Sequence, residues 1–237
     1  MNEAEAEQQR AYYARTAEHY DAMHVSDRDE HCIALAALAG LARLCGATSI
    51  LDVGAGTGRA LVRLQRELPG VMLTGVEPVA ELRAIGHGNG ISPEMLRDGD
   101  ALALPFADDS FDFVIETGVL HHIAEPSRAV AEMVRVARLG VLISDANNLG
   151  QGSPPARLAK RIIAGLGLWR AFIALATRGK MSKWSEGDGL FYSYSVFTDA
   201  ALLKPKFPRL FFMNTAPLVG TDLKHGASSV ALFGLRQ

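Results

Sequence analysis

Residues 49–61 read "SILDVGAGTGRAL", and this stretch decides which fold the rest of the chain is expected to follow. A short apolar run ends in Asp52, three glycines then alternate with other residues, and a helix-like pattern follows. Glycine has no Cβ, so it lets the backbone turn tightly and approach a ligand closely. The order of strand, glycine turn and helix therefore predicts a ligand loop at the first turn of a parallel α/β sheet.

The spacing of these glycines separates two kinds of cofactor. The fingerprint for a dinucleotide is G-x-G-x-x-G. Here the glycines are Gly54, Gly56 and Gly58, and Arg59 stands where the fingerprint has its third glycine. The loop therefore favours a ligand other than a nicotinamide dinucleotide, although a nicotinamide-dependent oxidoreductase stays open as the alternative.

Short apolar runs and helical patterns alternate between residues 28 and 146, which predicts βαβ units and a mostly parallel sheet. The expected strands are residues 48–54, 71–77, 111–117 and 140–146, and the expected helices include residues 59–68 and 126–138. Two later apolar runs, 209–216 and 228–236, are joined by a short loop, so they should pair antiparallel. We expect a single α/β domain over 1–237, with an N-terminal helical cap at about 1–46 and an inserted lid at about 147–195.

The composition excludes some classes of protein. A length of 237 residues suits one domain, and a net charge of −2 gives no overall signal for a nucleic-acid partner. The N-terminus is acidic and polar, unlike a secretory signal, and no apolar run is long enough to span a bilayer. The sequence alone therefore favours a cytoplasmic protein.

Several motifs in order resemble the class I S-adenosylmethionine-dependent methyltransferases, in their small-molecule branch. The glycine loop resembles motif I, and the next expected strand ends in an acid, Glu77. "RDGDALALPFADDSFDFV" (97–114) resembles motif III, "VLHHI" (119–123) resembles the motif after strand four, and "AYYARTAEHYDAMH" (11–24) resembles the opening helix. The resemblance implies a Rossmann-like, seven-stranded sheet, mostly parallel with an antiparallel terminal strand, and helices on both faces.

The resemblance also implies S-adenosyl-L-methionine as the cofactor. Glu77 would accept hydrogen bonds from the ribose, Asp100 from the adenine amino group, and Ala101 would offer its backbone N–H to the ring. Packing of the tyrosines on the sheet edge and capping of turns by the aspartates are the alternatives. The residues expected to bind the cofactor are Tyr12, Tyr20, Asp52, Gly54, Ala55, Gly56, Gly58, Glu77, Pro78, Asp100, Ala101, Glu116 and Thr117.

A pair of histidines, His121 and His122, follows the third expected strand and supplies the candidate catalytic groups. An alcohol acceptor must lose its proton as the methyl group arrives, and a neutral histidine is suited to take it. The alternative is that both are ordinary turn residues. Metal-using quinone-biosynthesis O-methyltransferases resemble this loop but carry carboxylates where this chain has His121 and Gly118, so the loop predicts no metal site.

The acceptor is less well defined by the sequence. Polar residues beyond the core motifs are candidates to bind it, namely Asp145, Asn147, Tyr192, Tyr194 and His225. The favoured interpretation is an O-methyltransferase acting on a hydroxyl of a sugar, a lipid-linked saccharide or a natural product. A cofactor-binding protein of the same fold without catalysis is the other alternative. The Pro-Pro motif of base-amino methyltransferases does not follow the third expected strand, which argues against a nucleic-acid substrate.

One segment is strongly basic in a chain that is nearly neutral. Residues 146–185 contain no Asp or Glu but carry Arg157, Lys160, Arg161, Arg170, Arg178, Lys180 and Lys183. Two interpretations remain open. Either lid helices pack apolar faces on the domain with their bases in solvent, or the basic lid at 157–183 meets an anionic acceptor or an anionic membrane surface.

Overall fold

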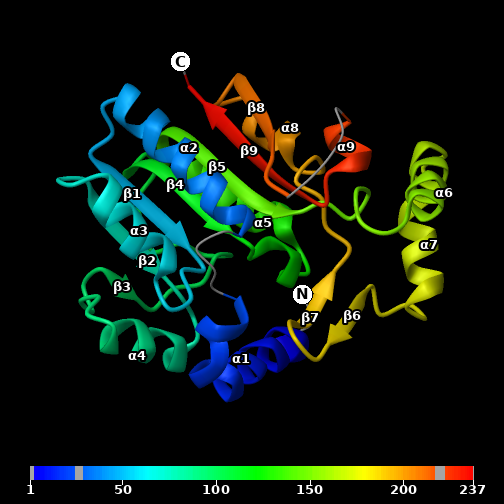
Figure 1. The fold of residues 1–237 in the computed structure, drawn as a ribbon, viewed down its shortest axis with the longest axis horizontal. Helices are drawn as coiled ribbons and strands as arrows, with labels where there is room; N and C mark the ends of the chain where they lie inside the picture. Colours follow the sequence, from blue (N-terminus) through cyan, green and yellow to red (C-terminus); the bar gives the residue numbers. More distant parts are fainter. Residues whose placement is uncertain (1–2, 25–28, 217–221, 237) are drawn as a thin grey trace.

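A seven-stranded sheet forms the centre of the protein, whose computed structural model describes residues 3–24, 29–216 and 222–236 (Figure 1). The strand order is β3-β2-β1-β4-β5-β9-β8, and β9 alone runs antiparallel to its neighbours. The strands are β1 (Ser49–Val53), β2 (Met72–Val76), β3 (Leu96–Arg97), β4 (Phe111–Thr117), β5 (Ala137–Ala146), β8 (Arg209–Asn214) and β9 (Ser229–Leu235). The expected sheet, including its antiparallel last strand, is confirmed.

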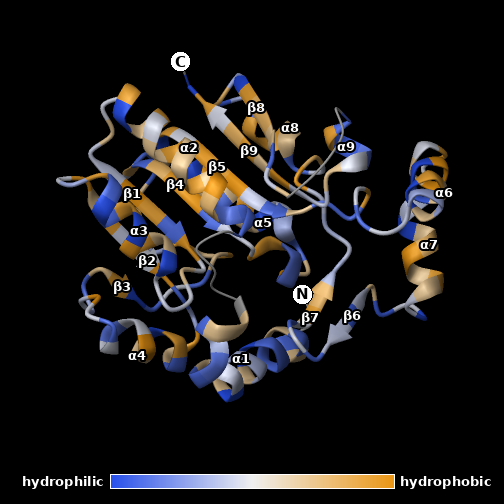
Figure 2. Ribbon diagram, viewed as in Figure 1, coloured by the Kyte–Doolittle hydropathy of each residue, from blue (hydrophilic) through white to orange (hydrophobic). Residues whose placement is uncertain are grey.

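Helices cover both faces of this sheet. Along β1, Ile50 packs with α2 (Glu30–Leu44) and α3 (Arg59–Glu67), whereas Leu51 packs with α5 (Pro126–Val136) and α8 (Ala200–Leu203). Successive side chains of a strand point to opposite faces, so both faces need cover when every residue of the strand is apolar or buried. Figure 2 shows the resulting apolar interior between the helices.

The glycine turn joins β1 to α3 and has the geometry that its sequence predicts. Gly58 has φ +87°, and a Cβ on it would lie 2.1 Å from Cδ1 of Ile91. This positive φ is a conformation that residues other than glycine rarely adopt, and a Cβ here would also require the Ile91 side chain to shift. The turn thus lies at the carboxyl end of β1, beside the carboxyl end of β2.

The expected N-terminal cap at 1–46 divides into two helices with different roles. α2 belongs to the core, since Leu35 and Leu38 are fully buried. α1 (Glu3–His24) lies against α4 (Ala80–Gly88), along the lower edge of the view in Figure 1. α1 lies outside the core, and His31 at the start of α2 also reaches the strand ends, with its Nδ1 2.9 Å from the Ser144 hydroxyl.

The inserted segment also has two parts. β6 (Ser182–Ser185) and β7 (Gly189–Tyr192) form an antiparallel hairpin, and β7 contacts α1. α6 (Pro154–Gly165) and α7 (Trp169–Ala176) form a helical hairpin that stands away from the sheet (Figure 1). α6 has no buried residue and α7 has only Ile173. The interpretation in which these helices bury their apolar faces on the domain is therefore wrong.

Candidate functional site

The strand-end pocket lies at the carboxyl ends of β1, β2 and β4, under α1. Its cavity volume is about 140 Å³, and it opens to solvent. The predicted cofactor residues that line it are Tyr20, Gly54, Glu77, Pro78, Asp100, Ala101 and Thr117. The sequence motifs therefore converge on one cavity although they are spread over almost a hundred residues.

Glu77 joins the end of β2 to the glycine loop. Its Oε2 accepts the Gly56 N–H at 3.0 Å and its Oε1 accepts the Val79 N–H at 2.9 Å. Burial raises the pKa of Glu77 to about 6, although these two hydrogen bonds favour the ionised form. At neutral pH, Glu77 is thus a carboxylate at the pocket wall.

Asp52 and Glu116 lie deeper than predicted. Both are buried, and neither lines the strand-end pocket. Burial raises the pKa of Asp52 to about 7, and burial together with Asp145 raises the pKa of Glu116. Among the described residues, Oδ1 of Asp52 and Oε1 of Glu116 have no hydrogen-bond partner. The two acids therefore lie behind the residues that line the pocket.

The other predicted loop residues lie around the same turn. Ala55 lines a small adjoining cavity, and a Cβ on Gly56 would lie 3.0 Å from the Tyr20 hydroxyl. Tyr20 thus covers the glycine loop closely. Asp100 accepts a hydrogen bond from Arg10 of α1 at 2.8 Å and one from the Leu102 N–H at 2.9 Å. Arg10, which the sequence did not single out, therefore stands at the same end of the pocket.

The tyrosines of α1 correct one prediction. Tyr12 is buried away from the pocket, and its hydroxyl donates to the Glu186 carbonyl at 2.7 Å. Tyr13 lines the pocket in its place, together with Tyr20. Tyr13 and Tyr20 are seven residues apart and therefore lie on the same face of α1. Tyr12, next to Tyr13, lies on a different face, so the helical period favours Tyr13 as the pocket residue.

The two histidines form a cluster with an acid from far along the chain. They lie in a 3₁₀ turn, Leu120–His122, just after β4. His121 Nδ1 lies 2.6 Å from Asp145 Oδ1, and His122 Nδ1 lies 2.6 Å from the Leu190 carbonyl oxygen. The Nε2 atoms of both rings lie 3.4 Å from carboxylate oxygens of Asp188, in the turn between β6 and β7. No sequence spacing pointed to Asp188, because 66 residues separate it from His122.

The charges around His121 decide its protonation. Burial lowers its pKa, but Asp145 and Asp188 outweigh burial and raise the pKa of His121 to about 10. Burial raises the pKa of Asp145, yet His121 and the Ala146 N–H bring it below its ordinary value. While both carboxylates face it, the His121 ring is protonated on both nitrogens at neutral pH and is therefore a poor general base.

The remaining predicted acceptor residues separate into different roles. Asn147 is fully buried; its amide donates to the carbonyls of the 223–227 turn and its Oδ1 accepts from Ser195. Because these hydrogen bonds occupy the Asn147 side chain, Asn147 holds the fold together and the prediction that it contacts an acceptor is corrected. His225 lies in α9 (Leu223–Gly226) with its ring at Asp222, and it lines none of the three pockets named here, which is a second correction.

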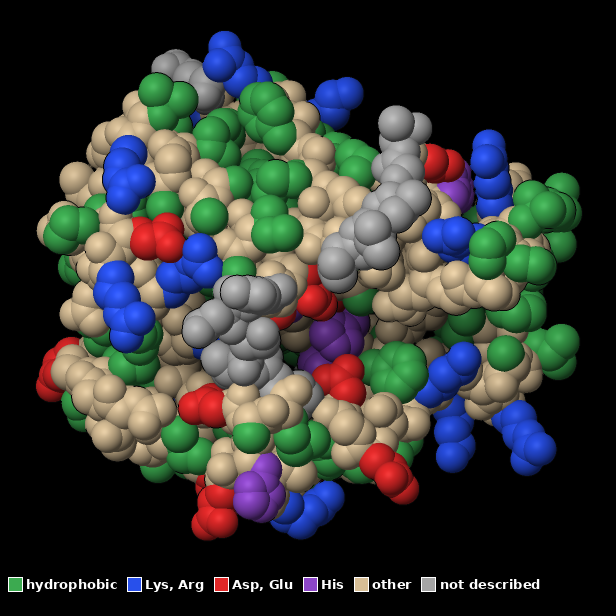
Figure 3. Space-filling model, viewed as in Figure 1, with side chains coloured by type: hydrophobic (Ala, Val, Ile, Leu, Met, Phe, Trp, Pro, Cys, Tyr) green, Lys and Arg blue, Asp and Glu red, His purple; other side chains and the backbone are tan. Residues whose placement is uncertain are grey.

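Two further pockets meet the strand-end pocket at the histidine cluster. The central pocket is lined by His121, His122, Asp145 and Asp188, and the hairpin pocket by His121, Asp188, Tyr192, Tyr194 and residues of α7. His122 also lines the strand-end pocket. Figure 3 shows histidine side chains in a hollow at the centre of the face, beside acidic ones. The cluster therefore lies between the expected cofactor position and two open cavities.

Comparison with known proteins gives a consistent fold. Residues 51–144 match the family model described as a methyltransferase domain. A S-adenosylmethionine-dependent methyltransferase from Thermotoga maritima, described as a possible histamine N-methyltransferase, superposes with a TM-score of 0.57 at 17% identity, over 97% of this chain and all of that one. Magnesium protoporphyrin IX methyltransferase from Synechocystis PCC 6803, solved with S-adenosylhomocysteine, gives 0.55 at 15% identity, over 88% of this chain and 84% of that one.

The curated relatives match over part of their length. Demethylmenaquinone methyltransferase from Roseiflexus sp. (strain RS-1) is 36% identical over 101 residues, which are 40% of each chain. Phosphatidylethanolamine N-methyltransferase from Cereibacter sphaeroides is 32% identical over 120 residues, 48% of this chain and 58% of that protein. The match thus spans less than two thirds of either relative. In the part of the chain that the structure describes, no helix combines the length and apolarity needed to cross a bilayer.

Proposed function

We propose that the chain transfers the methyl group of S-adenosylmethionine to a small-molecule acceptor, because residues 51–144 match the model of a methyltransferase domain and the fold is similar to that of solved methyltransferases. The observation that carries the proposal is the strand-end pocket, in which the glycine turn, Glu77 and Asp100 meet under α1. The cofactor has an amino-acid tail, a ribose and an adenine, so it needs backbone and carboxylate acceptors rather than a phosphate cradle. These are the groups that the pocket offers.

The residues present fit the cofactor in detail. Glu77, ionised at neutral pH and at the pocket wall, suits the ribose hydroxyls, and Asp100 suits the adenine amino group. Tyr13 and Tyr20 supply aromatic cover from α1. When bound, the cofactor supplies a sulfonium that makes its methyl group electrophilic, and the protein's task is to hold an acceptor in line with it.

The acceptor is proposed to be a hydroxyl that reaches His121, His122 and Asp188. These side chains stand where the strand-end pocket meets the central and hairpin pockets. Asp145, Tyr192 and Tyr194 line the acceptor-side cavities and would surround the rest of the molecule. An O-methyltransferase for a saccharide or natural product is the function that this arrangement supports best.

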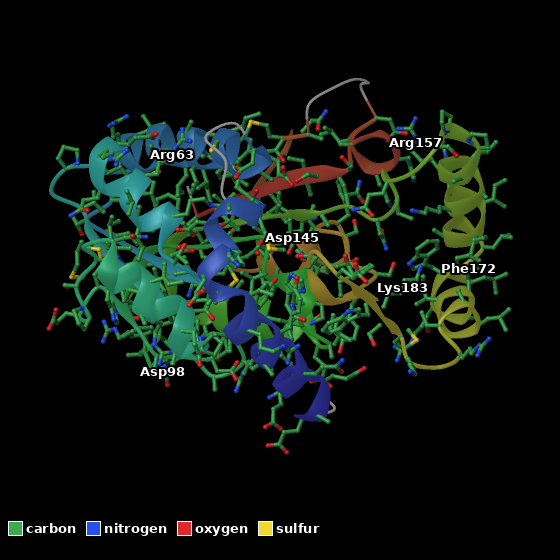
Figure 4. The ribbon with its side chains drawn as sticks, turned by 60° about the horizontal axis from the view of Figure 1, so that its bottom comes forward. Arg63, Asp98, Asp145, Arg157, Phe172 and Lys183 are labelled. Atoms are coloured by element: carbon green, nitrogen blue, oxygen red, sulfur yellow. The ribbon has the colours of Figure 1, made fainter. Side chains whose placement is uncertain are left out.

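The surface of the α6–α7 hairpin supports an acceptor held at an anionic membrane. Large apolar side chains are exposed along it, with Leu166 at 67% and Leu175 at 82% of their full accessibility. Seven bases and no acids lie in residues 146–185, which include this hairpin. Figures 3 and 4 show basic and apolar side chains on this side of the molecule, with Arg157 and Phe172 to the right of Asp145. Apolar area with bases around it is the composition of an interfacial element that binds anionic lipid.

The hairpin pocket extends from this surface to the histidine cluster. Trp169, Phe172 and Lys183 line it together with His121 and Asp188. A lipid-linked saccharide lying at a membrane would reach the cluster by this route, with Lys183 available to a phosphate.

Two measurements test the function and its alternatives. Calorimetric titration should give micromolar binding of S-adenosylhomocysteine and much weaker binding of NAD; tighter binding of NAD would favour the oxidoreductase alternative. A screen of saccharides, lipid-linked saccharides and phenols with a labelled methyl donor should then identify an acceptor. Cofactor binding without transfer to any class of acceptor would favour a non-catalytic role.

A further inference from the structure

Three groups that can bind a metal ion converge on one point of the acceptor side. They are Nε2 of His121, Nε2 of His122 and the carboxylate of Asp188, and one ligand atom from each lies within 4.8 Å of the others. The loop that holds the histidines lacks the carboxylates of metal-using relatives. The third group comes instead from the turn between β6 and β7.

The hydrogen bonds of both rings leave Nε2 as the lone-pair nitrogen when the ring is neutral. Nδ1 of His122 lies 2.6 Å from the Leu190 carbonyl oxygen and 3.1 Å from the Gln9 amide nitrogen. The shorter contact is to a group that only accepts, so it places the proton on Nδ1. The ionised Asp145 likewise accepts from Nδ1 of His121 at 2.6 Å. Histidines that bind metals are usually held in this way, with the second nitrogen donating to a carboxylate or a backbone carbonyl.

The distances between the two rings and Asp188 are compatible with a shared cation. Each Nε2 lies 3.4 Å from a different oxygen of Asp188, which is longer than an ordinary N–H···O contact. Ligand atoms at about 2.0–2.2 Å from a tetrahedral metal are roughly 3.3 Å from one another. The Tyr13 hydroxyl, 2.9 Å from Nε2 of His122, is a further oxygen within reach.

The turn that carries Asp188 is held firmly to α1. Gln9 is buried; its amide donates to the Asp188 carbonyl at 3.1 Å, and its Oε1 accepts the Leu190 N–H at 2.6 Å. One side chain thus fixes both the residue that supplies the carboxylate and the residue that orients His122. Such support from outside the ligand set is what a metal site needs.

We propose that His121, His122 and Asp188 bind one divalent transition-metal ion of the zinc class at the junction of the three pockets. Two imidazoles and a carboxylate are a common ligand set for such ions, and three protein ligands leave a position open. The role of the ion, though not its binding, rests on the proposed function. The acceptor hydroxyl takes the open position, loses its proton to solvent, and its oxygen bonds to the methyl carbon as the S–C bond breaks and leaves neutral S-adenosylhomocysteine.

Metal binding is measured directly, by equilibrium dialysis against Zn²⁺ and by the visible spectrum of the Co²⁺ form. The expected result is one ion per chain with a spectrum of low coordination number. Asp188→Asn should weaken binding beyond the 10–100-fold that loss of an outer partner typically costs, and Asp145→Asn should fall within about that range. Glu186→Gln, an exposed acid in the same turn, is the matched control and should bind normally.

Equal affinity in the Asp188→Asn and Glu186→Gln proteins, or no stoichiometric binding in the unmutated protein, overturns the metal site. Titration with S-adenosylhomocysteine on the same samples separates the two proposals. Cofactor binding without metal binding refutes only the metal site, whereas metal binding without cofactor binding refutes the proposed function. Methyl transfer that survives complete chelation refutes the role assigned to the ion.

Discussion

At the scale of single residues, Glu77 carries most of the expected cofactor recognition. Its carboxylate meets the glycine loop on one side and the strand-end pocket on the other. Removing it in Glu77→Ala should cost a charge-assisted hydrogen bond of about 1.5–3 kcal/mol, or roughly 10- to 150-fold in affinity for S-adenosylhomocysteine. Calorimetry measures this, with the exposed Glu81→Ala of α4 as the control. Unchanged affinity in a folded Glu77→Ala protein would contradict the assignment.

The raised pKa of the same carboxyl predicts how binding depends on pH. Burial brings the pKa of Glu77 to about 6, so it gains a proton as the pH falls below that value. A neutral carboxyl is a weaker acceptor for the ribose, and affinity should fall about tenfold between pH 7 and pH 5. Asp52, with a pKa of about 7, titrates nearby, so Glu77→Gln serves to isolate the step. The Glu77 assignment fails if this variant keeps the full pH dependence.

At the scale of elements, the contact between α1 and the β6–β7 turn depends on Gln9. Gln9→Ala leaves the Leu190 N–H and the Asp188 carbonyl without this partner, at a cost of about 1–3 kcal/mol for each group that stays buried. Hydrogen exchange measured by mass spectrometry should become faster in residues 186–192. Gln8→Ala, one position along and exposed, is the control. Equal exchange in the two variants would show that the turn is held by other contacts.

The α6–α7 hairpin predicts binding to anionic vesicles. Co-sedimentation should be strong with phosphatidylglycerol vesicles, weak with phosphatidylcholine alone, and reduced by salt. Each base contributes about 1 kcal/mol near such a surface, so Arg161→Gln with Arg170→Gln, both exposed on the hairpin, should weaken binding about 30-fold. Lys204→Gln with Arg209→Gln, on exposed residues outside the hairpin, makes the same change of charge as a control. If binding does not depend on lipid charge, or if no binding is seen, the basic residues are only solvent-exposed side chains without a role at a membrane.

At the scale of the whole molecule, Asp112 ties three parts of the sheet together. Its carboxylate accepts the Thr48 N–H at 2.7 Å, the Thr48 hydroxyl at 2.9 Å and the Arg138 guanidinium at 2.8 Å. Burial raises the pKa of Asp112, but these hydrogen bonds outweigh it and hold the pKa below its ordinary value. The residue before β1, the start of β4 and the start of β5 therefore depend on one ionised side chain.

The sign of this shift sets the pH range in which Asp112 stabilises the fold. A lowered pKa gives stability that is fully present above the ordinary value near 4 and is lost as the pH falls through the folded-state value. Asp112→Asn should lower the free energy of unfolding by about 1.5–3 kcal/mol at pH 7, and the difference should shrink below about pH 4. Urea unfolding at several pH values measures it, with Asp98→Asn as an exposed control. A difference that stays constant down to acid pH would exclude ionisation as the cause.

The sequence by itself determined the parts of this protein that depend on local pattern. The strands at 111–117 and 209–214 and the helices at 59–67 and 126–136 lie within a few residues of their predicted ranges, since burial of a strand or helix face imposes its own period. The glycine turn was found from the spacing of its glycines, and Glu77 and Asp100 from the resemblance of their motifs. In a parallel sheet the carboxyl ends of strands share an edge, so motifs far apart in sequence meet there.

Only the tertiary structure decided what depends on the path of the chain. Asp188 joins His121 and His122 because the β6–β7 hairpin folds back onto α1, and no periodicity encodes that return. Asn147 proved to be a structural residue because distant carbonyls take its amide hydrogens. Large apolar side chains of α6 and α7 stay exposed because the hairpin contacts the domain over a small part of its surface, near α9 and at Ile173, although their sequence would suit a buried helix equally well. Local sequence specifies which side chains prefer burial, whereas the partners that bury them or leave them free are set by long-range contacts.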